Sequence, residues 1–170
     1  MIAVVPIGPA TAPELIEAVD DPANRIIVLV PDRESPVPAG RLTELFSPDL
    51  AVGAVVPQVR RPDGRLAEAG LVTAGGRQAS RHLDPALSDP AATAADVDGT
   101  GYPWIAFRRD LLAGRSVDPA SSANRLVGQV LAATAAAGLR VVYEPAWVIH
   151  TGERRSVQVP PAATGRPDPP

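Results

Sequence analysis

Short apolar runs and a helix-like segment alternate along the first part of the chain. Residues 2–7 and 25–30 are apolar and rich in β-branched side chains, which is typical of buried strands. Between them lies a helical segment that Thr11 and Glu14 would begin with a capping box, each side chain bonding the amide of the other. Because strands that flank a helix usually pair in parallel, the pattern predicts a βαβ unit.

The rest of the chain continues this alternation and adds a hairpin. We expect a strand at 52–59 that turns at residues 62–64 into a partner at 66–72. The longest predicted helix, 122–137, ends at Gly138 in a left-handed cap. The other expected elements are a short helix at 40–46, an apolar piece at 105–107 leading to a helix start at 108–112, and final strands at 141–143 and 147–150. Together these elements predict an α/β fold with a mixed, mainly parallel sheet flanked by helices.

The composition fits one domain of ordinary size. The chain has 170 residues, of which 45% are hydrophobic, so it is long enough to bury a core, and we assign residues 1–155 to one domain. Residues 156–170 are rich in proline and have little to bury, which predicts a disordered tail. Residues 84–95 lack periodicity and predict a long surface loop.

Charge and cysteine content disfavour several classes of protein. The chain has no cysteine, which excludes disulfides and thiolate-bound metals, and its net charge of −3 gives no electrostatic reason to expect nucleic acid as a partner. No apolar run approaches the roughly 20 residues that a membrane span needs, and the amino terminus lacks a basic signal-peptide region. We therefore expect a cytoplasmic protein without a membrane span.

Two carboxylates follow the strand at 25–30 and are candidates for binding a cation. Asp32 and Glu34 are one residue apart at the carboxyl end of that strand, where ligands of α/β sheets gather. Magnesium and manganese take oxygen ligands, and manganese also accepts an imidazole such as that of His150. Alternatively, the carboxylates belong to a polar loop and His150 bonds the backbone at a strand end. His82 lies in loop-like sequence and is interpreted as solvated.

Three stretches keep the order and spacing of a known family. VGAVVPQVRRPDGRLAEAG carries a proline at Pro57, Pro-Asp-Gly at 62–64 and a glycine at Gly70. RRDLL at 108–112 matches a helix start, and AAAGLRVVYEPAWVIHTG, which ends with His150 and two further residues, is the most specific match. Over about residues 25–155 the chain resembles the family 2 glycosyltransferases, shortened in their amino-terminal nucleotide-binding half.

This resemblance implies a reduced GT-A-like fold and sugar transfer from a nucleotide-sugar donor to an acceptor that the sequence does not name. In the family, an acidic turn and a late histidine hold a divalent metal on the donor diphosphate. The corresponding ligands here would be Asp32, Glu34 and His150, with manganese or magnesium as the cofactor.

The catalytic base of the family has no counterpart at its expected place. It is an aspartate in a Glu-Asp pair, and counting back from Gly138 puts that pair at Leu126 and Val127, which we interpret as core residues. No Asp or Glu occurs at 119–143. The catalytic residue is therefore unknown, and Asp118 is the one weak candidate nearby.

Tyr102 and Trp104 stand where the family places small residues near donor and acceptor. They would either fill that pocket or stack on a sugar. Three possibilities stay open: an active metal-dependent glycosyltransferase, a catalytically inactive relative that acts as a binding or assembly module, or a structural scaffold that has also lost metal ligation. The second would work as a homo-oligomer or with a glycosyltransferase partner, and it predicts an apolar surface where the missing half would have packed.

Overall fold

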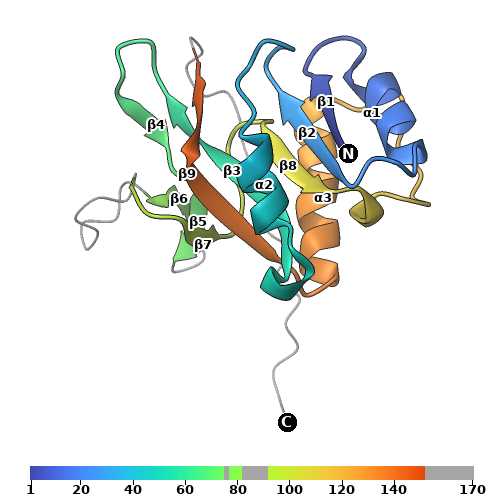
Figure 1. The fold of residues 1–170 in the computed structure, drawn as a ribbon. Helices are drawn as coiled ribbons and strands as arrows, with labels where there is room; N and C mark the ends of the chain where they lie inside the picture. The colour runs from blue at the N-terminus through green and yellow to red at the C-terminus, as the bar shows by residue number, and fades with distance from the viewer. Residues whose placement is uncertain (75–76, 82–91, 152–170) are drawn as a thin grey trace.

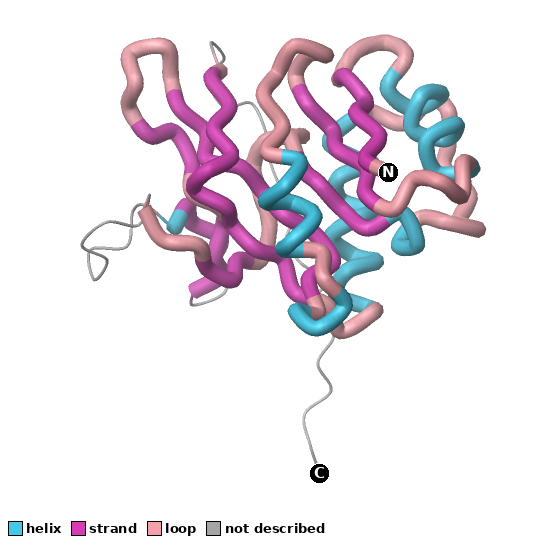
Figure 2. Tube along the Cα trace, in the orientation of Figure 1, coloured by secondary structure: helices cyan, strands magenta, loops and turns pink. Residues whose placement is uncertain are grey.

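A mixed seven-stranded sheet forms the centre of the protein in the computed structural model, which describes residues 1–74, 77–81 and 92–151 (Figures 1 and 2). Its strands are β1 (Ile2–Pro6), β2 (Ile26–Val30), β3 (Val52–Arg60), β4 (Leu66–Glu68), β7 (Ala95–Val97), β8 (Ile105–Arg108) and β9 (Arg140–His150). A separate hairpin consists of β5 (Leu71–Ala74) and β6 (Arg77–Ser80). The helices are α1 (Thr11–Asp20), α2 (Ala39–Leu45) and α3 (Ala123–Ala136), with short 3₁₀ turns η1 (Pro48–Leu50) and η3 (Arg109–Leu111).

Strand β8 interrupts the parallel part of the sheet. The strand order is β1-β2-β8-β3-β9-β7, with β4 attached to β3. Strands β1, β2, β3 and β9 share one direction, but β8 runs the opposite way between β2 and β3. The α/β class and the mixed sheet are confirmed, whereas the expectation of mainly parallel pairing is wrong, because only β1/β2 and β3/β9 pair in parallel. The apolar piece at 105–107 is this central antiparallel strand.

The two faces of the sheet bury two separate groups of side chains. All five residues of β2 are buried, with Ile27 and Leu29 facing one way and Val28 and Val30 the other. Helices α1 and α3 cover the first face, and α2 covers the second, in front of the sheet in Figure 1. Burial on both faces explains why this strand is a continuous apolar run rather than an alternating one.

The turn and cap predicted from glycine positions are confirmed. Strands β3 and β4 form the expected antiparallel hairpin, whose turn contains Gly64 with a φ of 78°. The partner strand is shorter than the predicted 66–72, because β4 ends at Glu68 and residues 71–72 belong to β5. Helix α3 ends at Gly138, which has a φ of 66°. There the amides of Gly138 and Leu139 donate to the carbonyls of Ala135 and Thr134, which is the Schellman arrangement.

Three local predictions are wrong. Thr11 does not cap α1 but lies inside it, and its hydroxyl bonds the amide of Gly8 at 2.6 Å to close the preceding turn. The two predicted final strands are one strand, β9, with a bulge: Glu144 pairs with Pro57 and Val148 with Gln58, which leaves 145–147 without partners. The helix start at 108–112 is the single turn η3.

Predictions for His82 and for the tail at 156–170 lie outside the described residues, as does most of the surface loop at 84–95. The described end of that loop enters β7 at Ala95.

Candidate functional site at the carboxyl edge of the sheet

The connections after β1 and β2 diverge at the carboxyl edge of the sheet. The loop after β1 leads to α1 on one face, and the loop after β2 leads to α2 on the other (Figure 1). Adjacent parallel strands whose connections go to opposite faces leave a crevice between their loops, which is where α/β sheets bind ligands. This edge is therefore the candidate functional site, and Asp32 lies in it as predicted.

Asp32 is engaged in the turn that it belongs to. Its Oδ1 accepts hydrogen bonds from the amide of Glu34 and the hydroxyl of Ser35, both at 3.0 Å. The amide of Ser35 donates to the Asp32 carbonyl at 3.2 Å. This Asx-type turn matches the polar-loop alternative for the segment. The carboxylate of Glu34 is exposed and makes no hydrogen bond or ion pair within the described part of the chain.

An ion pair spans the crevice between the two loops. Arg33, in the loop after β2, donates to Glu14 in the first turn of α1 at 2.7 Å. The two side chains are 65% and 31% exposed, so water screens the pair and its contribution to stability is small. The Glu14 carboxylate therefore competes with any anion that would bind to Arg33 between the two connections.

His150 lies at the same edge but on a distant strand. It ends β9, is exposed, and pairs with Arg60 of β3. Strands β8 and β3 separate β9 from β2, and three strand spacings amount to about 14 Å. No three His, Asp or Glu side chains of the described residues are placed to hold a metal ion. The structure therefore does not gather Asp32, Glu34 and His150, and a manganese or magnesium ion does not fit these residues as they stand.

The bulge of β9 ties this strand to α2 and to the Asp32 loop. The buried carboxylate of Glu144 accepts from Arg41 of α2 at 2.8 Å and from the amide of Ala146 at 2.9 Å. Trp147 is buried, and its Nε1 donates to the Pro36 carbonyl at 3.1 Å. Sequence reasoning missed this set, because the bulge after Glu144 is what puts Trp147 on the same face of the sheet as α2.

Tyr102 and Trp104 fill space beside α2. They are 7% and 6% exposed and stack on each other, with ring centroids 4.8 Å apart and an interplanar angle of 18°. Both belong to the apolar cluster on the α2 face. Tyr102 and Trp104 therefore fill space, which is the first of the two roles considered for them. Their burial leaves little ring surface for a sugar.

The positions corresponding to the family's base are part of the core. Leu126 and Val127 are 0% and 4% exposed and pack in the cluster beneath α1 and α3. Asp118 is exposed in the loop before α3, where its Oδ1 accepts from the amide of Ala120 at 2.9 Å. Its carboxylate thus closes a local turn.

Two buried polar groups near the hairpin also escaped the sequence reading. Glu68 is 1% exposed, and its Oε1 accepts from the Thr100 hydroxyl and the Gly101 amide, both at 2.8 Å. Burial raises the pKa of Tyr143, which accepts a hydrogen bond from Gln58 at 2.9 Å. In the sequence, the only sign that Glu68 is special is that a carboxylate occurs within the predicted hairpin strand.

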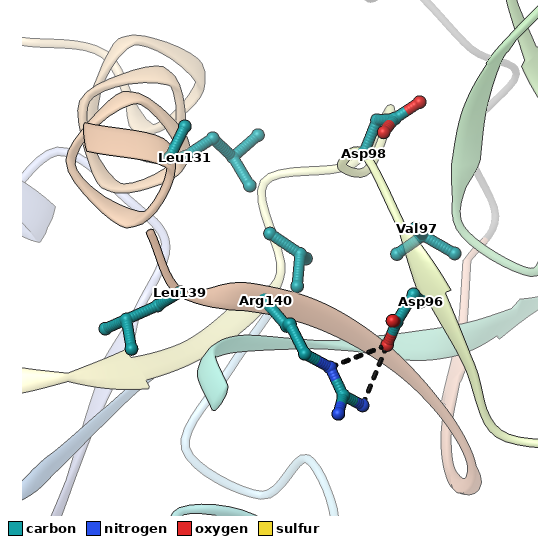
Figure 3. Close-up of a pocket in the computed structure, with 8 residues that line it drawn as sticks. Asp96, Val97, Asp98, Leu131, Leu139 and Arg140 are labelled. Carbon is teal, nitrogen blue, oxygen red and sulfur yellow. Dashed lines mark hydrogen bonds and ion pairs between the residues drawn. The ribbon is translucent and has the colours of Figure 1, made fainter. Parts of the chain in front are cut away.

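A small cavity lies between α3, β7 and the start of β9 (Figure 3). It has about 260 Å³, which is below the usual range for small-molecule sites of roughly 300–1,000 Å³. Its walls are largely apolar, and at its rim Arg140 donates to Asp96 at 2.8 and 3.0 Å. Asp98, the other charged residue of the lining, accepts a hydrogen bond from the Thr73 amide, so the cavity offers little to a ligand.

Comparisons with known proteins leave the family open. No family model matches the chain, and a search of curated proteins finds no significantly similar sequence. Within the described residues, every helix is too short or too polar to cross a membrane.

Proposed function

We propose that the protein is a glycosyltransferase-like binding module that takes a nucleotide-sugar type of ligand but does not transfer the sugar. The observation that carries this proposal is the burial of Leu126 and Val127 where the resemblance places the catalytic base. A side chain without a basic atom takes no proton from an acceptor hydroxyl, and such assistance is worth roughly 100-fold to 10,000-fold in rate.

The divergent loops after β1 and β2 support ligand binding in this proposal. Divergent connections of this kind are where α/β sheets bind ligands, and Arg33, which is 65% exposed, places a cation between them. Because the described carboxylates and His150 do not gather around one point, a divalent metal has no part in the proposed binding.

An assembly role through an apolar face has less support. The described residues expose only two large hydrophobic side chains, Met1 and Leu50, at 68% and 43%. They do not amount to the apolar surface that a missing half would have covered. We therefore favour small-molecule binding over assembly as the role of the module.

The test is a panel of nucleotide-sugars, assayed in parallel for binding and for turnover. Thermal unfolding should show stabilisation by at least one uridine or guanosine diphosphate sugar, and release of the nucleotide diphosphate should stay at the rate of buffer. The matched variant is Glu14→Gln, which frees Arg33 and should strengthen that binding. Stabilisation by none of the donors would refute the proposed binding.

Turnover would instead favour the active glycosyltransferase. In that case Asp118→Asn separates the alternatives, because it removes the one nearby carboxylate base while its Oδ1 still accepts from Ala120. Loss of turnover in this variant would assign Asp118 as the base.

A further inference from the structure

A larger cavity lies at the opposite edge of the sheet from the crevice. It has about 630 Å³, within the range of small-molecule sites, and is formed by the start of β2, the end of α2 and the end of β8. Three of the residues that line it are arginines: Arg25, Arg108 and Arg109.

The sheet register brings these arginines together. Strands β2 and β8 are antiparallel, and Ile26 pairs with Arg108. The amide of Arg109 then donates to the carbonyl of Arg25 at 3.0 Å. The end of one strand thus lies beside the start of the other, and both contribute residues to the lining of the same cavity.

None of the three guanidinium groups has a carboxylate partner among the described ion pairs. Arg108 donates to the carbonyls of Val52 at 2.6 Å and Ser47 at 3.2 Å, and Arg109 to that of Val19 at 2.9 Å. These acceptors are neutral, so they orient the guanidinium groups and leave their charges uncompensated. Arg25 is exposed.

The cavity therefore carries a net positive charge within an acidic protein. Asp110 is the one acid among its lining residues, so three positive charges and one negative charge leave +2. A phosphate monoester carries about −1.5 to −2 at neutral pH, which matches this charge better than a carboxylate does. Arginine also presents paired donors that suit phosphate oxygens.

We propose that this cavity binds the phosphate group of a small phosphorylated molecule. Arg108 and Arg109, held by backbone carbonyls, provide fixed donors, and Arg25 closes on the ligand from the exposed side. The apolar part of the ligand contacts Ile26 and Phe46, which also line the cavity. This site is separate from the crevice at the carboxyl edge and does not depend on the function proposed for it.

The test is an NMR titration of the full chain at constant ionic strength with inorganic phosphate, phenyl phosphate and acetate. Arg25→Gln removes a charge from a side chain that makes no hydrogen bond within the described residues, and Arg61→Gln makes the same charge change in the exposed β3–β4 turn. Phosphate should shift amides around the cavity in a saturable way. Arg25→Gln should weaken phosphate binding about threefold to tenfold, as for one exposed charge-assisted hydrogen bond, while Arg61→Gln leaves it unchanged.

A variant with the opposite sign completes the design. Asp110→Asn removes the acid at the cavity and should strengthen phosphate binding about twofold or more. Tighter binding of phenyl phosphate than of inorganic phosphate supports a phosphorylated molecule, and equal binding overturns that in favour of free phosphate. The site itself is overturned if phosphate gives no saturable shifts, if Arg25→Gln and Arg61→Gln act alike, or if acetate binds as tightly as phosphate.

Discussion

At the carboxyl edge of the sheet, Asp32, Arg33 and Glu144 are all bonded to other groups of the protein, whereas Arg25, Arg108 and Arg109 at the opposite edge have no carboxylate partner within the described part of the chain. The first edge is where chemistry is expected in an α/β sheet, and its polar side chains hold turns, a helix and a bulge in place. The second edge keeps charges that the fold does not compensate. A ligand at the carboxyl edge has to displace Glu14 from Arg33, whereas at the opposite edge it meets arginines that have no carboxylate partner among the described residues.

The largest expected difference between the edges is in stability. Trp147→Ala empties a buried site beside α2 and removes the hydrogen bond to Pro36, so it should lower the free energy of unfolding by about 3–5 kcal/mol. Trp147→Phe should cost less, because it keeps most of the ring. Urea unfolding followed by circular dichroism measures both.

Arg25→Gln is the matched change at the opposite edge. Because this side chain is exposed and has no ion-pair partner in the described part of the chain, its replacement should change stability by less than about 0.5 kcal/mol. If Trp147→Ala and Arg25→Gln lowered the free energy of unfolding by similar amounts, the fold would depend on both edges of the sheet alike.

A smaller effect is expected at Asp32. Asp32→Ala removes the acceptor for Glu34 and Ser35 in an exposed turn and should cost about 1 kcal/mol in the free energy of unfolding. Asp32→Asn keeps an oxygen at the same place and should be close to the wild type. Thermal unfolding of the two variants compares them directly; if asparagine is as harmful as alanine, the negative charge matters more than the turn.

Local signals in the sequence predicted much of the fold. Strand β2 is a continuous apolar run, and Gly64 and Gly138 occupy positions with positive φ, so that strand, hairpin and helix end were each predictable from neighbouring residues. The insertion of β8 between β2 and β3 was not, because four apolar or basic residues carry no information on which strands they join.

The candidate site was harder to predict because it depends on spacing across the sheet. Asp32 and His150 follow the carboxyl ends of strands, as the sequence suggested, but β8 and β3 lie between those strands. Likewise, Trp147 joins Glu144 on the α2 face only because the bulge leaves 145–147 without partners. Strand order and bulges come from tertiary packing, and one sequence does not reveal them.

The smallest expected effect is that of manganese on stability. A site with a dissociation constant of 10 μM would raise the free energy of unfolding by about 2.7 kcal/mol at a 100-fold excess of metal. Because Asp32, Glu34 and His150 are not gathered, 1 mM MnCl₂ should change it by less than about 0.5 kcal/mol relative to EDTA. Urea unfolding in both buffers measures this. Stabilisation above about 1 kcal/mol that disappears in His150→Ala would mean that the carboxyl edge rearranges around a metal and uses its polar side chains to bind it.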